Sequence, residues 1–525
     1  MKRILAIVLA AMMLLSLIPA ASAESDTGVL RDSIVLCESS EWWGADVTQL
    51  DGTSFFQRMI GEPVCTLDGD GNLQPNVASE IKVSDDYLTI TLTIPEGMYY
   101  FSGEQVEPED VIASIERIQK VCPFASQFAT ITSMEQDGRD VILHLDHYSA
   151  DTNAALSSSY MTIMDKDVLD VTTDEELYWD CHPYGMYDLK EYVSGAYVVL
   201  ERNPGFKCYN PYVENKGASY IQEVTIRFIS EEFTTAQEFN AGNLDYIANI
   251  SADGAAQITR EGAVKTLVQT NGQVNYIEMN LTDSIIGDQT IRLAIALAID
   301  REELCEMYNN IIIPDYSFVT SKVRNFNADW EANYKANYCN DPDRARALLD
   351  EAGIVDTDGD GIREKDGVPL IIHFVYGQTA YDTVVCQGLQ IQLQRELGIY
   401  LDLDAQDDNY HYESLGNGDF QMGMSRFGTT DTVQLLQWVL CYFDSFACMP
   451  DYISGEDEYM ALCDQLAQEP DSAKRTEMVY NMEYIIGDSV LVIPLFTNRA
   501  EVVYQEGVTP MVYMGDGQAF VNDMK

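Results

Sequence analysis

Apolar and polar side chains alternate with a period of two in several short stretches of the chain. In residues 88–94, leucine and isoleucine alternate with threonine, which is typical of a half-buried strand. Strands are also predicted near Gly195 and Tyr276 and at 34–37, 141–145, 224–228, 244–250, 370–376, 399–404, 490–496 and 501–505.

Other stretches have the spacing of amphipathic helices. Pro108 opens one such helix, and Asp341 and Pro342 stand at the N-cap and first positions of another. Residues 290–299 are almost wholly apolar, so this helix should be buried, and Asp300 should cap the helix that follows. Further helices are predicted at 55–60, 233–241, 384–396, 456–467 and 473–486.

Strands and helices therefore alternate along the chain, which predicts an α/β fold. With 525 residues, the chain is long enough for two or three domains. Residues 151–179 are expected to be irregular, and 409–450 are rich in aromatic residues, glycine and aspartate.

The first 23 residues have the pattern of a secretory signal peptide. Lys2 and Arg3 precede an apolar run, and Ala21-Ser22-Ala23 forms a small-residue cleavage site. We therefore expect an exported protein, in the periplasm or at the cell surface. The first cysteine is Cys37, so no lipobox cysteine stands at the cleavage site.

Charge and cysteine content narrow the classes of partner. There are 85 acidic and 31 basic residues, a net charge of −54, and such a surface repels nucleic acid and anionic lipid. Eleven cysteines in an exported chain predict some disulfides, with at least one thiol left over. Cys441 and Cys448 are close enough in sequence to close a short loop.

The stretch DTDGDGIREKDG, residues 356–367, resembles a calcium loop. Asp356, Asp358 and Asp360 would fill the first, third and fifth ligand positions. The twelfth position, which needs a bidentate glutamate, is Gly367; Glu364 at the ninth position is an imperfect substitute. A surface turn without metal is therefore the preferred interpretation, and Ca²⁺ the alternative.

Catalysis has little support in the sequence. The five histidines form no metal-binding spacing, and neither HExxH nor GxSxG occurs. We therefore expect a protein that is not an enzyme.

Seven segments in order resemble the extracytoplasmic solute-binding proteins of ABC transporters, family 5, which includes oligopeptide- and dipeptide-binding proteins. They are LQPNVASEIKVSDDYLTITLTIPEGMYYFSGEQVEPEDVIASIERI, GAYVVLERNPGF, EFNAGNLDYI, IRLAIALAIDREEL, NDPDRARALLDEAG, LQIQLQRELGI and IPLF. The chain departs from the family pattern at HPYGMYDLKEYVSGAY, and no Asp-Pro follows Asp431.

The resemblance implies a periplasmic-binding-protein-like fold (class II type) of two lobes. Lobe I would comprise residues 24–62, 179–275 and 489–525, with an additional subdomain at 63–178, and lobe II residues 276–488. Closure would be a hinge motion about strands near 275–280 and 491–496.

The resemblance also implies a ligand cleft between the lobes. It places Asp431 where peptide-binding members pair an aspartate with the ligand's α-ammonium, and Arg426 as the candidate for a ligand carboxylate. A helix N-cap is the alternative for Asp431, and a structural ion pair for Arg426.

Aromatic residues could cover a ligand at the mouth of this cleft. Trp42 and Trp43 follow the first strand, although two adjacent tryptophans can also be one core and one surface residue. Tyr100 and Tyr410, with Tyr99, are further candidates, whereas Phe496 is expected in the core.

The resemblance implies a monomeric receptor that captures di- or oligopeptides and delivers them to the transmembrane subunits of an ABC permease. Alternatives within the family are receptors for oligosaccharide, nickel or haem. A calcium-dependent secreted protein or a hydrolase is the alternative outside it.

Overall fold

The computed structural model describes residues 28–50, 55–268, 272–429, 432–436, 455–513 and 519–525. The predicted signal peptide, Asp431, Cys441 and Cys448 lie outside these ranges. No helix within them is long and apolar enough to cross a lipid bilayer.

The described strands form three larger sheets. The seven-stranded sheet has the order β12-β21-β11-β1-β10-β9-β8, the six-stranded sheet β14-β20-β13-β19-β17-β18, and the four-stranded sheet β4-β5-β7-β6. The bounds in the first are β1 (Arg31–Glu38), β8 (Tyr187–Val193), β9 (Tyr197–Arg202), β10 (Ile221–Phe228), β11 (Tyr246–Ile250), β12 (Ala263–Val268) and β21 (Ala500–Gln505). In the second they are β13 (Val274–Met279), β14 (Ile312–Pro314), β17 (Ile371–Gly377), β18 (Tyr400–Gln406), β19 (Met422–Phe427) and β20 (Val492–Asn498). In the third they are β4 (Glu80–Val83), β5 (Thr89–Thr93), β6 (Ile131–Asp137) and β7 (Asp140–Leu145).

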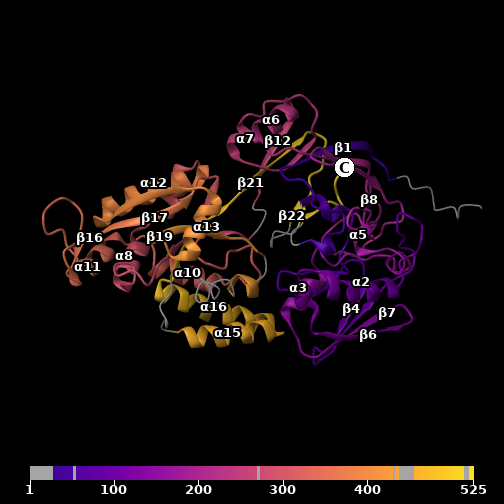
Figure 1. Ribbon diagram of the computed structural model, residues 1–525, viewed down its shortest axis with the longest axis horizontal. Helices are drawn as coiled ribbons and strands as arrows, with labels where there is room; N and C mark the ends of the chain where they lie inside the picture. Colours follow the sequence, from indigo (N-terminus) through magenta and orange to yellow (C-terminus); the bar gives the residue numbers. More distant parts are fainter. Residues whose placement is uncertain (1–27, 51–54, 269–271, 430–431, 437–454, 514–518) are drawn as a thin grey trace, which may run out of the picture.

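Helices cover these sheets in two lobes, which Figure 1 shows side by side. The first lobe holds the seven- and four-stranded sheets with α2 (Pro108–Val121), α3 (Ala150–Leu156), α4 (Lys166–Leu169), α5 (Asp174–Leu177), α6 (Glu232–Asn240) and α7 (Ala252–Ala256). The second lobe holds the six-stranded sheet with α8 (Gln289–Ala298), α9 (Arg301–Met307), α10 (Ala328–Asn337), α11 (Pro342–Glu351), α12 (Ala380–Leu397), α13 (Asp408–Asn417), α15 (Glu456–Gln468) and α16 (Ser472–Ser489).

Short strand pairs complete the described structure. They are β2 (Cys65–Leu67) with β3 (Leu73–Pro75), β15 (Glu364–Lys365) with β16 (Val368–Pro369), and β22 (Val512–Tyr513) with β23 (Ala519–Phe520).

Each lobe has its own hydrophobic core. In the first, Ile34 and Leu36 of β1 share one cluster with Ile90 and Leu92 of β5, so the four-stranded sheet packs on the same core as the seven-stranded sheet. The main core of the second lobe lies between the six-stranded sheet and helices α8, α11 and α12. The mixed α/β fold predicted from the sequence is confirmed.

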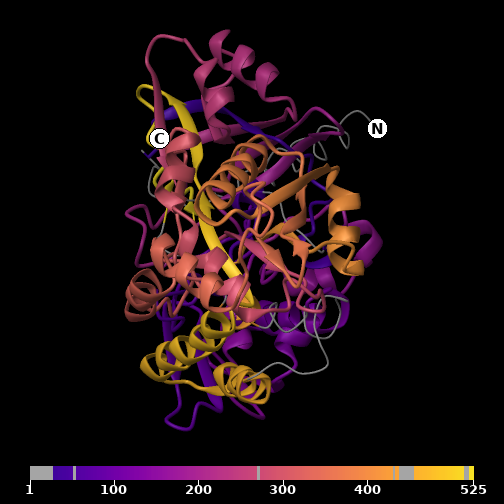
Figure 2. The ribbon, with the colours of Figure 1, turned by 90° about the vertical axis from the view of Figure 1, so that its left-hand side faces the viewer.

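Two segments cross between the lobes. One runs from β12 to β13, and the other joins β20 of the second lobe to β21 of the first through a single residue, Arg499. Figure 1 and Figure 2 show β21 as the yellow strand that runs between the two parts of the molecule.

Two helices begin at the aspartate N-caps that were predicted from the sequence. The Asp341 carboxylate accepts a hydrogen bond from the backbone N–H of Arg344 (3.0 Å), and that of Asp300 accepts one from Glu303 (3.0 Å). Helix α8 is buried as predicted, and its one cation, Arg292, donates hydrogen bonds to backbone carbonyls, among them Val490 and Ser489. These carbonyls satisfy the buried guanidinium, although burial lowers its pKa to about 10.

Three local expectations need correction. Residues 151–179 are not irregular, because they contain α3, α4 and α5, whose N-caps are side chains of Ser149, Asp165 and Thr173. The helix expected at 55–60 is a 3-10 helix, Phe55–Met59. Disulfides were expected, but all nine described cysteines are buried free thiols.

Candidate interlobe binding site

The carboxyl ends of parallel strands meet between the lobes. In the first lobe, β1 pairs in parallel with β10 and β11, and β21 begins at the edge where these strands end, with Glu501 opposite Ile250. In the second lobe, β17 pairs in parallel with β18 and β19. Strand β13 is antiparallel to both β19 and β20, so β20 also ends at this edge. Ligands of open α/β sheets bind outside such carboxyl ends.

A cavity of about 230 Å³ lies between these two sheet edges. Residues of the first lobe, of the two crossing segments and of the second lobe all line it. They are Glu232, Asn249, Ile250, Ser251 and Ala252; Gln273, Asn498, Arg499 and Ala500; and Tyr308, Ile311, Ile312 and Tyr381. A molecule bound here would contact both lobes, which is what lobe closure on a ligand requires.

The cavity wall combines aromatic rings with hydrogen-bonding groups. Tyr308 and Tyr381 are in edge-to-face contact, with ring centroids 6.5 Å apart, and Tyr381 also packs on Phe496. The Glu232 carboxylate is engaged locally, because it accepts hydrogen bonds from the backbone N–H and the hydroxyl of Ser251. Such a wall suits a small solute held by a few directed polar contacts.

Arg426 ends up beside the cavity, next to an acid. Its Nη1 donates to the Tyr381 hydroxyl (2.8 Å) and lies 3.4 Å from Oδ2 of Asp382, whose side chain is buried. A small pocket of about 10 Å³, also lined by His411 and Tyr412, adjoins this pair. The arrangement fits the structural ion pair that was the alternative to carboxylate binding.

The two tryptophans after β1 lie in different environments. The Trp42 indole is buried in the core of the first lobe, and its Nε1 donates to Oε2 of Glu38 (2.9 Å). Trp43 is 61% exposed. This is the core-and-surface alternative for adjacent tryptophans, and neither side chain lines the cavity.

The remaining aromatic candidates also lie in different environments, some in a hydrophobic core and some on the surface. Tyr100 is buried in the first-lobe core in edge contact with Tyr184, whereas Tyr99 is partly exposed. Tyr410 is exposed on α13. Phe496 is buried in the second-lobe core, as expected.

Sequence reasoning did not find the residues that line the cavity. Asn249 lies near the end of β11 and Ser251 follows that strand, Tyr381 lies in the first turn of α12, and Arg499 stands between two apolar strands. Of these residues, only Arg499 could have been noticed in the sequence. It is a charged residue between two apolar strands, and charged side chains are rarely buried in a hydrophobic core.

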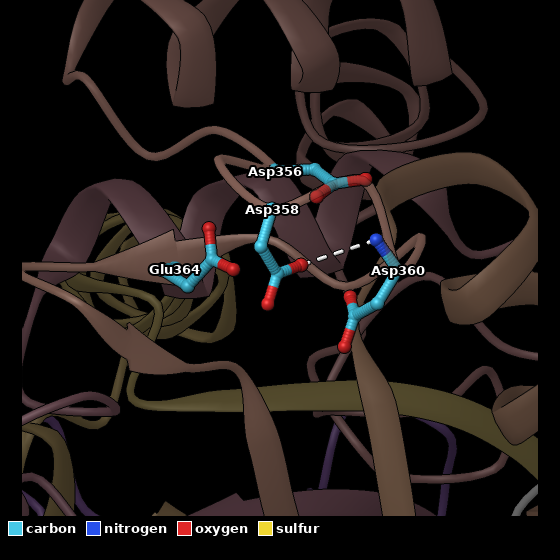
Figure 3. Close-up of side chains that lie close together, drawn as sticks. All are labelled: Asp356, Asp358, Asp360 and Glu364. Atoms are coloured by element: carbon cyan, nitrogen blue, oxygen red, sulfur yellow. Dashed lines mark hydrogen bonds between the residues drawn. The ribbon is translucent and has the colours of Figure 1, made fainter.

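The Asp/Gly loop lies elsewhere, between α11 and β17 of the second lobe. Asp356, Asp358, Asp360 and Glu364 each place a carboxylate oxygen within 4.8 Å of the others (Figure 3). Ca²⁺ binds oxygen ligands, and a group of several carboxylates is a common way for proteins to supply them.

Hydrogen bonds between residues of the same loop stabilise its conformation. Asp356 accepts from the backbone N–H groups of Gly359 (2.7 Å) and Gly361 (2.9 Å), which lower its pKa. Glu364 accepts from the backbone N–H of Thr357. These bonds account for the turn by themselves, and calcium at this loop stays a prediction.

Comparison with known proteins places the chain among bacterial binding proteins. The family model described as "Bacterial extracellular solute-binding proteins, family 5 Middle" matches residues 72–442. The nickel-binding periplasmic protein of Escherichia coli (strain K12) is 23% identical over 384 residues, 70% of each chain. The oligopeptide-binding protein OppA of Bacillus subtilis (strain 168) is 20% identical over 496 residues, 88% of this chain and 86% of OppA.

Solved structures show the same fold. NikA from Brucella suis, in complex with Fe(III)-EDTA, has a TM-score of 0.76 at 19% identity, covering 94% of this chain and 99% of NikA. The ABC transporter substrate-binding protein CtaP from Listeria monocytogenes has a TM-score of 0.74 at 18% identity, covering 91% and 95%. The predicted two-lobe fold is thereby confirmed.

Proposed function

Because the chain belongs to the family 5 bacterial extracellular solute-binding proteins, we propose that it is the substrate-binding component of an ABC importer for peptides. Di- or oligopeptides enter the cleft between the lobes, and the loaded protein, a monomer outside the cytoplasm, delivers them to the transmembrane subunits of a permease. The observation that carries this proposal is the cavity at the crossing strands, which residues of both lobes line.

The relatives support the role of a solute receptor, but they are named for different solutes. One curated relative is named for nickel and another for oligopeptides, both at low identity. The described cavity wall contains no histidine or cysteine, the side chains that bind nickel most readily, whereas its amides and tyrosines suit a peptide backbone. We therefore place peptides before nickel, haem or oligosaccharide.

We propose the predicted lobe boundaries, which are 24–62, 179–275 and 489–525 for lobe I, with the subdomain at 63–178, and 276–488 for lobe II, with one correction. Strand β20 lies in the six-stranded sheet of the second lobe, so residues 489–498 belong to lobe II. Arg499 and the segment before β13 then form the hinge, where small backbone rotations separate or join the two sheet edges.

Asp431 remains the proposed partner of the peptide's α-ammonium group, because a buried ammonium needs a carboxylate. Trp43 and Tyr410, both exposed aromatic residues, are proposed as groups that a closing cleft could bring to the ligand. Tyr100 and Trp42 contribute to the core instead.

A thermal-unfolding screen tests the proposal. Di- to pentapeptides with free termini, nickel with histidine, haem and oligosaccharides are each added to the purified chain. A ligand at 100 times its Kd should stabilise the protein by about 2.7 kcal/mol. Stabilisation by peptides supports the proposal; stabilisation by another class alone, or hydrolysis of the added peptide, overturns it.

A further inference from the structure

The hydroxyl group of Thr497, a fully buried residue of β20, lies between oxygen atoms of two other segments. Its Oγ1 contacts Oδ2 of Asp315, which follows β14, and lies 3.1 Å from the backbone carbonyl oxygen of Gln273. Gln273 belongs to the segment that crosses from β12 to β13, and Thr497 stands shortly before Arg499, where the chain crosses for the second time. The hydroxyl group therefore connects both crossings to an acid of the second lobe.

The two contacts of Thr497 show where the hydrogen atoms must lie. A hydroxyl group has one hydrogen to donate, and a carbonyl oxygen can only accept. Thr497 can donate to Gln273 while it is bonded to Asp315 only if the Asp315 carboxyl group is protonated and donates to Thr497. An ionised Asp315 can only accept, so Thr497 would turn to it and the Gln273 carbonyl would lose this donor. The geometry thus fits a neutral carboxyl group at Asp315.

The surroundings of Asp315 favour the same state. Burial raises the pKa of Asp315 to about 7. The nearby cations are engaged by other groups, because Lys335 pairs with Glu331 (2.6 Å) and Arg301 donates to the backbone carbonyl of Pro494 (2.7 Å). The charged and titratable side chains that face Asp315 come from three helices: Arg301 and Cys305 of α9, Glu331 and Lys335 of α10, and Glu483 of α16.

The same contacts reach the wall of the interlobe cavity. Gln273, Ile312 and Asn498 all line this cavity. Strand β14, which contains Ile312, pairs with β20 directly before Asp315. A change in the protonation of Asp315 therefore acts on wall residues of both sheet strands and of the first crossing segment, although Asp315 does not itself line the cavity.

We propose that Asp315 is a proton-dependent switch in the hinge between the lobes. With its proton, Asp315 donates to Thr497, which donates to Gln273 and so holds the two crossing segments together. When the proton passes to solvent water, Thr497 donates to Asp315 instead and releases the segment that leads to β13.

Solute binding should follow the same proton, a step that rests on the proposed function. A wall that is already ordered loses less freedom on binding than a loosened one, so the protonated form should bind more tightly. Linkage then requires that binding takes up protons where Asp315 is partly ionised, and that affinity falls as the pH rises above 7.

Hydrogen exchange followed by mass spectrometry tests the switch without any solute. Asp315→Asn keeps a donor towards Thr497 at every pH and so mimics the protonated form. In peptides covering 272–277 and 494–498, we expect the wild type and Asp315→Asn to exchange equally at pH 5.5. At pH 8 the wild type should exchange about 3- to 10-fold faster, as the loss of one hydrogen bond predicts. Comparing two proteins at one pH cancels the intrinsic pH dependence of exchange.

Two further variants make this experiment specific. In a Thr497→Val background, Asp315→Asn should no longer change exchange in peptide 272–277 at pH 8, because the connecting hydroxyl group is gone. Asp329→Asn, at an exposed aspartate of α10, removes the same charge and should match the wild type at both pH values. Wild type and Asp315→Asn that differ equally at both pH values, or at neither, overturn the switch.

Calorimetric titration with trialanine tests the link to the solute. In the wild type and Asp329→Asn, affinity should fall between pH 7 and pH 8 by up to about 10-fold more than in Asp315→Asn, the limit set by one proton. In buffers of different ionisation enthalpy at pH 7.5, binding to the wild type should take up a larger fraction of a proton than binding to Asp315→Asn.

The two experiments separate the two proposals. If none of the screened peptides binds but exchange depends on Asp315 as expected, peptide capture is wrong while the switch stands. If trialanine binds with the same pH dependence in the wild type and Asp315→Asn, peptide capture stands and the link between the switch and binding is wrong.

Discussion

Single buried side chains show how this acidic chain accommodates carboxyl groups in its interior. Glu483 of α16 is almost fully buried, and its Oε1 accepts hydrogen bonds from the Ser317 hydroxyl (2.6 Å) and the Val319 backbone N–H (3.0 Å). Burial raises the pKa of Glu483 to about 8. The same cause raises the pKa of Asp315 to about 7. Both acids therefore hold a proton at pH values where exposed carboxyls are ionised.

Glu483→Gln should change how stability depends on pH. The folded-state pKa of Glu483 is raised, so the wild type holds a proton that the unfolded chain has lost between pH 4.5 and 8, and its stability falls over this range. Glutamine keeps the acceptor oxygen and cannot ionise. Urea unfolding should give the variant an advantage over the wild type that grows between pH 5 and 8, on the order of 1–4 kcal/mol.

Glu477→Gln, exposed on the same helix, is the matched control and should show no such trend. An advantage of Glu483→Gln that is the same at pH 5 and pH 8 would contradict the burial argument.

The contact between Arg426 and Asp382 gives a second prediction at this scale. Arg426→Gln removes a positive charge beside a buried carboxylate, so we expect a loss of about 1–3 kcal/mol of unfolding free energy at pH 7. Adding Asp382→Asn should recover part of this loss. Denaturant unfolding of the two single variants and the double variant measures the coupling, and strictly additive losses would sink the ion-pair account.

At the scale of elements, helix α16 of the second lobe forms hydrogen bonds to the first lobe. Arg475 in its first turn donates to the Tyr148 hydroxyl (3.2 Å) and to the backbone carbonyl of Asp70, both in the first lobe. Helix α15 also contacts α3. This non-covalent connection supplements the two covalent ones.

Tyr148→Phe should weaken this contact between the lobes and leave the rest of the fold unchanged. It removes one interlobe hydrogen bond to a charged donor, worth about 1 kcal/mol, while the ring keeps its edge contact with Tyr87. Hydrogen exchange followed by mass spectrometry should speed up in peptides covering 68–72 and 469–476. Tyr484→Phe, exposed on α16, should leave those peptides unchanged; faster exchange in both variants, or in neither, contradicts the assignment.

The sequence predicted elements better than it predicted the site. The helix after Asp341 and the buried helix α8 could be found because their caps and apolar faces are local signals. The four-residue helices α4 and α5 have too few turns to show a period. The cavity wall could not be found, because residues such as Ser251, Tyr381 and Arg499 meet only through the crossing of two sheets.

At the scale of the whole molecule, the described cysteines have a structural rather than a covalent role. All nine are buried free thiols, and burial raises the pKa of Cys37 to about 11 and that of Cys463 to about 12. They pack as small apolar side chains.

Thiol titration at pH 8 checks this role. We expect at most two thiols, those of Cys441 and Cys448, to react with Ellman's reagent in the native protein, and the other nine only after denaturation. Rapid reaction of more than two thiols under native conditions would contradict the described burial.

The central claim is that a peptide binds in the cavity between the lobes. Calorimetric titration of Ala252→Trp with a peptide that binds the wild type tests it most directly, because the indole at this wall position fills the cavity. Ala241→Trp, at an exposed site after α6, is the matched control. The account predicts that Ala252→Trp loses binding while Ala241→Trp retains it, and wild-type affinity in Ala252→Trp would contradict it.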